Sequence, residues 1–164
     1  MTKRVSPGLL VRNLLWTALA PGMVTGYLPY RIVFHWYPGD IPPWNEVRIF
    51  GVALILPGVV ILVACIWRFA VSGKGTLSPL DAPRRLVTGG IYRYVRNPMY
   101  LAVMLILLGE TLMFHSIPLA IYTALCFGFF NLLVLCYEEP ALRRKFGEEY
   151  IRYCQTAGRW LPRK

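Results

Sequence analysis

Residues 99–137, "MYLAVMLILLGETLMFHSIPLAIYTALCFGFFNLLVLCY", form two long apolar runs separated only by "HSI" at positions 115–117. The first run extends from Met99 to about Phe114, and the second from Pro118 to Tyr137. About 20 apolar residues cross the hydrocarbon layer of a bilayer as a helix. A connection this short leaves room only for a tight turn between two helices. The stretch therefore predicts a tight antiparallel hairpin of two transmembrane helices.

The composition of the whole chain agrees with a membrane protein. Of its 164 residues, 56% are hydrophobic, which is more apolar side chain than a soluble protein of this size can bury. Two further apolar stretches precede the hairpin, one from about Leu9 to Phe34 and one at 47–71. The predicted fold class is an all-α integral membrane protein with four transmembrane helices. We expect residues 1–70 to hold the first two spans and residues 71–164 the remainder, within one structural domain.

The basic residues predict the orientation in the membrane. They lie before the first span, between the second and third spans, and after the fourth. These groups contain Lys3, Arg4 and Arg12; Lys74, Arg84, Arg85, Arg93 and Arg96; and Arg143, Arg144, Lys145, Arg152, Arg159, Arg163 and Lys164. An even number of spans places all three groups on one face, and lysine and arginine accumulate on the cytoplasmic side. The sequence therefore predicts a multi-pass protein whose N- and C-termini are both cytoplasmic.

The net charge of +10 follows from this orientation, since a basic cytoplasmic face suits anionic lipid headgroups. No nucleic-acid-binding motif accompanies it, so membrane lipids are the predicted partners and nucleic acid is not. The four cysteines have no metal-ligand spacing and are expected to be reduced thiols, so no metal site is predicted. Oligomeric state is left open by the sequence.

Polar side chains gather at the two ends of the hairpin that lie on the cytoplasmic side. Asn97 precedes Pro98, which makes Pro98 a natural first residue of the third span, and a helix start attracts an anionic group. At the end of the fourth span, Asn131 and Glu138 are two helical turns apart on one face, and Glu139 follows. Because the hairpin is tight, these two walls should be neighbours. A ligand with a carboxylate, a cationic centre and hydroxyl groups would suit both.

Simpler explanations of the same residues stay open. The arginines can reach lipid headgroups, the tyrosines can form an interfacial belt, and the glutamates can be solvated. After the fourth span, Leu142, Phe146 and Tyr150 recur at four-residue spacing. This spacing predicts a C-terminal amphipathic helix on the membrane surface, either as a lid over the site or as a lipid anchor.

The motifs "GGIYRYVRNPMY", "YEEPALRRKFGEEYIRY" and "RWLP" resemble the membrane methyltransferase family of isoprenylcysteine carboxyl methyltransferases and phospholipid N-methyltransferases. The resemblance covers about residues 84–162 and implies a cytosol-facing pocket for S-adenosyl-L-methionine. The cofactor-binding residues that it implies are Leu86, Val87, Tyr92, Asn97, Pro98, Tyr100, Glu138 and Glu139. The predicted catalytic residues are Arg96, Asn131 and Glu138. The family commonly has histidine at the position of Asn97.

The predicted function is therefore an S-adenosylmethionine-dependent integral membrane methyltransferase. Its acceptor would be a lipid or another lipophilic small molecule that enters sideways from the bilayer. Two alternatives remain: an NADPH-dependent membrane reductase of the sterol type, which would use clustered arginines for extra phosphates, and a non-catalytic membrane protein.

Overall fold

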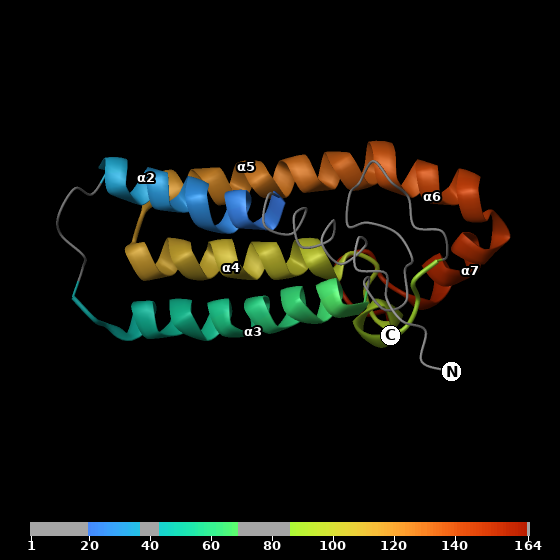
Figure 1. The fold of residues 1–164 in the computed structure, drawn as a ribbon, viewed down its shortest axis with the longest axis horizontal. Helices are drawn as coiled ribbons and strands as arrows, with labels where there is room; N and C mark the ends of the chain where they lie inside the picture. The colour runs from blue at the N-terminus through green and yellow to red at the C-terminus, as the bar shows by residue number, and fades with distance from the viewer. Residues whose placement is uncertain (1–19, 37–42, 69–85, 164) are drawn as a thin grey trace, which may run out of the picture.

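The computed structural model describes residues 20–36, 43–68 and 86–163, and all regular elements within these ranges are helical. Figure 1 shows that the long helices lie side by side along the longest axis. They are the helical stretch 20–36, α3 (Glu46–Arg68), α4 (Pro98–Phe114) and α5 (Ile117–Leu133). The prediction of an all-helical protein is confirmed for this part of the chain.

Within the described residues, two helices are long and apolar enough to cross a bilayer. They are α3, with 23 residues, and the continuous helix Ile117–Phe146, with 30 residues. Only 17% and 22% of their apolar windows are buried inside the protein, whereas the core helix of a soluble protein would be mostly buried. The apolar helix α4 is shorter, at 17 residues. Much of the predicted first span, residues 9–19, lies outside the described residues.

The turn between α4 and α5 has well-defined local causes. His115 ends α4 in the left-handed conformation, at φ 49°, so the chain reverses at once. Ser116 then caps α5, because its hydroxyl oxygen accepts a hydrogen bond from the backbone N–H of Leu119 at 3.3 Å. The two helices consequently run in opposite directions beside each other (Figure 1).

Small residues let α3 and α4 approach each other closely. A Cβ atom built on Gly109 would lie 2.5 Å from the backbone oxygen of Gly51, and one on Gly51 would lie 2.6 Å from the oxygen of Gly109. About two helical turns further along α3, a Cβ atom on Gly58 would lie 3.0 Å from the backbone oxygen of Ala102. Since apolar helices in lipid gain mainly from close packing, glycine at these positions fixes the pairing of the two helices.

Two wide turns of π-helix interrupt the regular helices, and each precedes a proline. Met23–Tyr27 (η1) comes just before Pro29 in α2 (Leu28–Trp36), and Val134–Glu138 (η4) comes just before Pro140. The ring of proline collides with the carbonyl four residues earlier and removes one N–H donor, which favours a widened turn. Proline alone does not require it, since α3 remains regular through Pro57.

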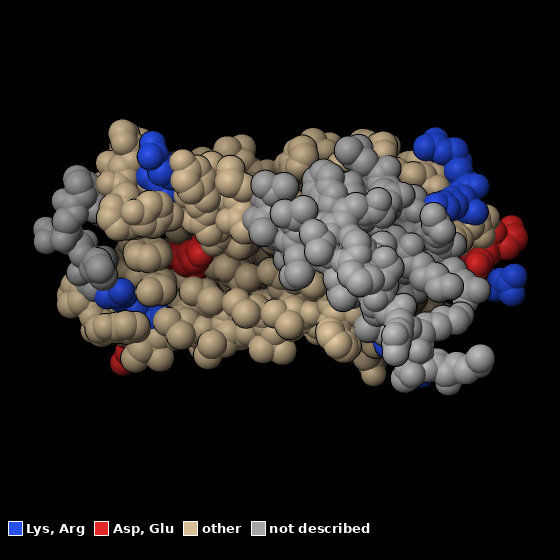
Figure 2. Space-filling model, in the orientation of Figure 1, with Lys and Arg blue, Asp and Glu red and all other residues tan. Residues whose placement is uncertain are grey.

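The chain after the acidic pair forms two helices, α6 (Glu139–Phe146) and α7 (Glu148–Thr156). The predicted single amphipathic helix is wrong in this respect, because Gly147 adopts φ 52° and separates the two. The apolar spacing was informative nevertheless, since Leu142, Phe146 and Tyr150 belong to one packed cluster. Figure 2 shows blue and red side chains gathered at the end where α6 and α7 lie in Figure 1.

Candidate functional site

The first wall of the candidate site is the entrance to α4. A short 3₁₀ turn, Gly90–Arg93 (η3), leads into it, and α4 begins at Pro98 as the sequence predicts. Proline suits the first helical position because a backbone N–H at that position has no acceptor within the helix, so the lack of this N–H in proline costs nothing. Arg96 and Tyr100 are four residues apart and flank this start.

The second wall lies where η4 passes into α6 within the continuous helix Ile117–Phe146, and it contacts the first wall through two side-chain pairs. Nη2 of Arg96 donates to Oε1 of Glu139 at 3.0 Å. The hydroxyl of Tyr100 donates to Oε1 of Glu138. The two glutamates are consecutive, and their partners lie on either side of the start of α4, with Arg96 before it and Tyr100 in its first turn, so both contacts hold the same end of α4 against the helix Ile117–Phe146. The predicted adjacency of the two walls is confirmed.

Glu139 is enclosed by a second cation that comes from the C-terminal tail. Nε of Arg159 donates to Oε1 of Glu139 at 2.7 Å, and Nη2 donates to Oε2 at 3.0 Å. This two-pronged geometry is the strongest arrangement of guanidinium and carboxylate. The hydrogen bond to Glu139 raises the pKa of Arg159, so the guanidinium stays charged. Glu139 itself is buried, with 6% of its surface exposed, and both of its oxygens are engaged.

The C-terminal tail, residues 157–163, is hydrogen-bonded through its backbone to the loop that precedes α4. The N–H of Arg96 donates to the carbonyl of Gly158 at 2.8 Å, and the N–H of Gly158 donates to the carbonyl of Tyr94 at 3.2 Å. The side-chain amide of Asn97 donates to the carbonyl of Arg159 at 3.2 Å. These hydrogen bonds fix the backbone of Gly158 and Arg159 beside the acidic pair, within reach of the Arg159 guanidinium.

Comparison with known proteins identifies the family. The sequence model of the family described as phospholipid methyltransferase matches residues 47–149, which include both walls of the site. The chain belongs to this family. The prediction of a membrane methyltransferase from the sequence is confirmed at this level.

Curated relatives of this phospholipid methyltransferase family member are plant enzymes. Protein-S-isoprenylcysteine O-methyltransferase A of Arabidopsis thaliana is 27% identical over 144 residues, which cover 87% of this chain and 73% of the relative. A probable protein-S-isoprenylcysteine O-methyltransferase of Oryza sativa subsp. indica is 33% identical over 79 residues, or 48% of this chain and 41% of the relative.

A solved structure shares the fold. It is the eukaryotic intramembrane Ras methyltransferase, isoprenylcysteine carboxyl methyltransferase, with a TM-score of 0.60 at 20% identity. The alignment covers 87% of this chain and 50% of that chain, so this family member spans half the length of the solved relative. The likeness establishes the arrangement of the helices.

The other cofactor-binding residues predicted for this family member lie around the entrance to α4 in separate packed groups. Val87 and Tyr92 are buried beside Cys65 of α3. Leu86 packs instead against the cluster that contains Tyr150 and Tyr153 of α7. Burial raises the pKa of Tyr92 well above its usual value, so its phenol stays neutral. The structure therefore brings Arg96, Tyr100 and the two glutamates into contact, and places Leu86, Val87 and Tyr92 in the surrounding packing.

Asn131 occupies the same region but its amide has protein partners. Its Oδ1 accepts a hydrogen bond from the indole Nε1 of Trp160 at 3.1 Å, and its Nδ2 donates to the carbonyl of Phe127 at 2.8 Å. The ring of Trp160 lies edge-on to Tyr100, with centroids 6.4 Å apart. Asn131 is thus connected to Tyr100 through an aromatic side chain of the tail.

Arg159 and Trp160 are the part of the site that the sequence analysis missed, and Tyr153 docks the chain before them through the carbonyl of Tyr92. The motif "RWLP" was one basis of the family resemblance, but its basic neighbours were interpreted as headgroup contacts. That interpretation placed Arg159 at the lipid surface, whereas the structure places it against Glu139. Two arginines thus surround Glu139, while the neighbouring Glu138 contacts only an uncharged side chain among the described residues.

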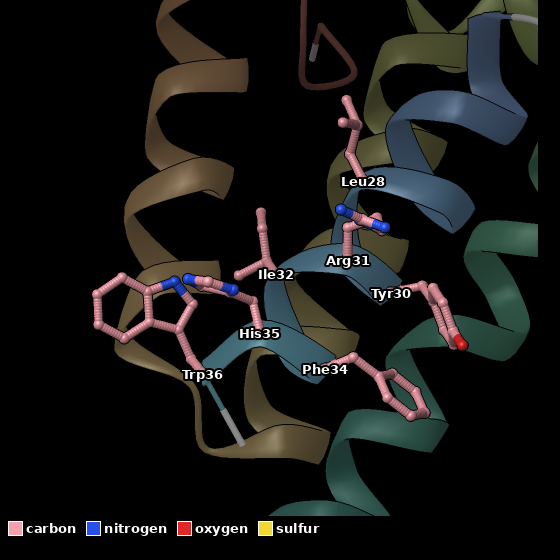
Figure 3. A pocket seen from close by; sticks show the side chains of 7 residues that line it. All are labelled: Leu28, Tyr30, Arg31, Ile32, Phe34, His35 and Trp36. Atoms are coloured by element: carbon pink, nitrogen blue, oxygen red, sulfur yellow. The ribbon is translucent and has the colours of Figure 1, made fainter. Parts of the chain in front are cut away.

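A cavity of about 530 Å³ lies elsewhere, on α2. Arg31, His35 and Trp36 are among its lining residues, and none of the predicted site residues is (Figure 3). In Figure 1, this part of α2 lies at the opposite end of the helices from α6 and α7. The cavity is therefore separate from the candidate site.

Replacing Tyr153 with phenylalanine tests how firmly the tail is docked. The buried hydroxyl of Tyr153 donates to the carbonyl of Tyr92 at 2.6 Å, so its loss leaves a buried acceptor unpaired. We expect the free energy of unfolding to fall by about 1–3 kcal/mol, measured by thermal unfolding in detergent. Tyr94→Phe is the control, because Tyr94 is 58% exposed, and it should change the melting temperature little.

Proposed function

We propose that this protein transfers a methyl group from S-adenosylmethionine to a lipid or another lipophilic acceptor within a membrane. Membership of the phospholipid methyltransferase family gives the reaction class. The observation that carries the proposal is the double contact of Arg96 with Glu139 and of Tyr100 with Glu138, which joins two walls rich in polar groups at one end of an apolar bundle.

The proposed topology has four transmembrane helices, formed by the first apolar stretch, α3, α4 and the helix that begins at Ile117. Exposed apolar side chains cover α3 and α5, as lipid contact requires; Val60, Trp67, Leu125 and Leu132 are each more than 60% exposed. With both termini in the cytoplasm, the entrance to α4 and the tail face the cytosol, where the water-soluble cofactor is available.

The residues of the site suit S-adenosylmethionine. Arg96 keeps a buried Nε–H with no hydrogen-bond partner among the described residues, and this donor can bind the carboxylate of the cofactor. Among the described residues Glu138 is paired with the neutral Tyr100 and with no cation, so its charge remains available to an ammonium group or to ribose hydroxyls. Tyr92 and Val87 provide apolar surface beside this wall.

When bound, the cofactor supplies an activated methyl group on a sulfonium centre. The task of the protein is then to orient the two reactants and exclude water, which lowers the barrier without a dedicated base. Arg96, Asn97 and Glu138 would hold the cofactor at the cytosolic rim, and an apolar acceptor would enter from the surrounding bilayer between the helices. The related plant enzymes are named for a lipid-modified cysteine substrate, which is consistent with an acceptor of this class.

The proposal is tested with purified protein in detergent and with total membrane extract. We expect saturable binding of S-adenosylhomocysteine, and transfer of a labelled methyl group from the cofactor into a lipid-soluble product that mass spectrometry can identify. Saturable binding of NADPH without binding of S-adenosylhomocysteine would instead favour a membrane reductase. Binding of neither ligand, with no labelled product, would favour a non-catalytic protein.

A further inference from the structure

Glu138 and Glu139 have different environments although they are consecutive. Glu138 contacts an uncharged tyrosine, whereas Glu139 is buried between Arg96 and Arg159. Neighbouring residues of a helix point about 100° apart. Any rotation of the helix that released Glu139 from its cations would therefore also turn Glu138 away from Tyr100.

The orientation of the Glu139 carboxylate is fixed mainly by Arg159. Arg96 offers one hydrogen bond to it, while Arg159 contacts both oxygens in a fork that fits only one orientation of the carboxylate. Arg159 is itself fixed on both sides, because Gly158 pairs with Tyr94 and Arg96, and the carbonyl of Arg159 accepts from Asn97.

We infer that Arg159 is a positioning residue for methyl transfer, which acts through Glu139 to hold Glu138 in its cofactor-binding orientation. The inference rests on the proposed function, since it names a residue that supports the same site. Glu138 is the last residue of the widened turn Val134–Glu138, whose backbone hydrogen bonds span five residues, as from the N–H of Glu139 to the carbonyl of Val134, in place of the regular four. The ion pair of Glu139 with Arg159 adds a contact from outside the helix that fixes the rotation of this turn.

The experiment compares Arg159→Gln and Arg159→Lys with the wild type in binding of S-adenosylhomocysteine and in steady-state methyl transfer. We expect Arg159→Gln to raise the dissociation constant and the KM for the cofactor about tenfold, because outer partners of ligand-binding groups contribute on this order. The KM for the acceptor should not change. Arg159→Lys keeps the charge but not the fork, so it should fall between the wild type and Arg159→Gln. Arg152→Gln, an exposed arginine of α7, is the matched control and should behave as wild type.

Two further variants separate positioning from simple docking of the tail. Tyr153→Phe loosens the tail without touching Glu139, so it should lower the melting temperature while leaving the cofactor KM near the wild-type value. The double variant Arg159→Gln with Glu139→Gln should lose no more affinity than the weaker-binding single variant, as expected for two residues that act as one unit.

The outcomes are distinguishable. A wild-type protein that neither binds S-adenosylhomocysteine nor transfers a methyl group would overturn the proposed function. An active wild type with unchanged cofactor KM in Arg159→Gln would overturn the positioning role alone. An equal loss of affinity in Tyr153→Phe and Arg159→Gln would also overturn it, because the docked tail rather than the ion pair would then be responsible.

Discussion

Glu138→Gln is expected to weaken binding of S-adenosylhomocysteine by about 10- to 150-fold, the range that corresponds to the loss of a hydrogen bond to a charged group. Glutamine has the shape of glutamate and its amide oxygen can still accept from Tyr100, so the packing of the two walls is preserved. What disappears is the negative charge available to the cofactor. Isothermal titration in detergent measures the affinity, and thermal unfolding verifies that the variant is folded.

Glu149→Gln provides the matched control for this prediction. Glu149 lies in the first turn of α7 and is exposed, so its replacement removes the same charge without changing the site. Its affinity for S-adenosylhomocysteine should equal that of the wild type. Wild-type affinity in Glu138→Gln as well would remove Glu138 from the proposed binding site and leave the acidic wall without a ligand role.

Gly109→Ala is expected to have the largest effect on stability. The added methyl group would lie 2.5 Å from the backbone oxygen of Gly51 and 2.6 Å from a side-chain carbon of Ile55, so α3 and α4 would have to move apart. Overpacking of this kind costs about 1–3 kcal/mol. We expect a clearly lower melting temperature in detergent and, because α4 carries Tyr100 and begins two residues after Arg96, weaker binding of S-adenosylhomocysteine.

Gly128→Ala is the corresponding control in α5. No atom of the described residues lies within 4 Å of a Cβ atom at Gly128, and alanine is a better helix former than glycine. The melting temperature should therefore remain the same or rise slightly. If Gly109→Ala were as stable as Gly128→Ala, the close approach of α3 to α4 would not contribute to the fold.

Much of the fold was predictable because long apolar runs have few alternatives. The runs that become α3, α4 and α5 each exceed the length of an ordinary core strand, and the "HSI" connection permits only a reversal of direction. The pairing of α3 with α4 was not predicted. It depends on which glycines of two uniformly apolar helices face each other, and the sequence lists glycines without indicating their partners.

The site was predictable in part for the same reason. A tight reversal places the start of α4 beside the far part of the helix Ile117–Phe146, so the contacts of Arg96 and Tyr100 with the acidic pair follow from topology. The position of Arg159 beside Glu139 does not follow from the order of the helices. It requires Gly147 to redirect the chain between α6 and α7, and residue types alone do not distinguish an arginine at a headgroup from one paired with a buried glutamate.

The widened turn at Val134–Glu138 has a consequence for insertions and deletions. A helix segment of this kind holds one residue more than the regular spiral would accommodate between Leu133 and Pro140. Removing a single residue there would restore a regular helix and leave the carboxylates that follow in their present orientation, whereas removing one from the regular part of α5 would turn them by about 100°. The segment Val134–Glu138 should therefore tolerate a one-residue deletion better than the regular part of α5.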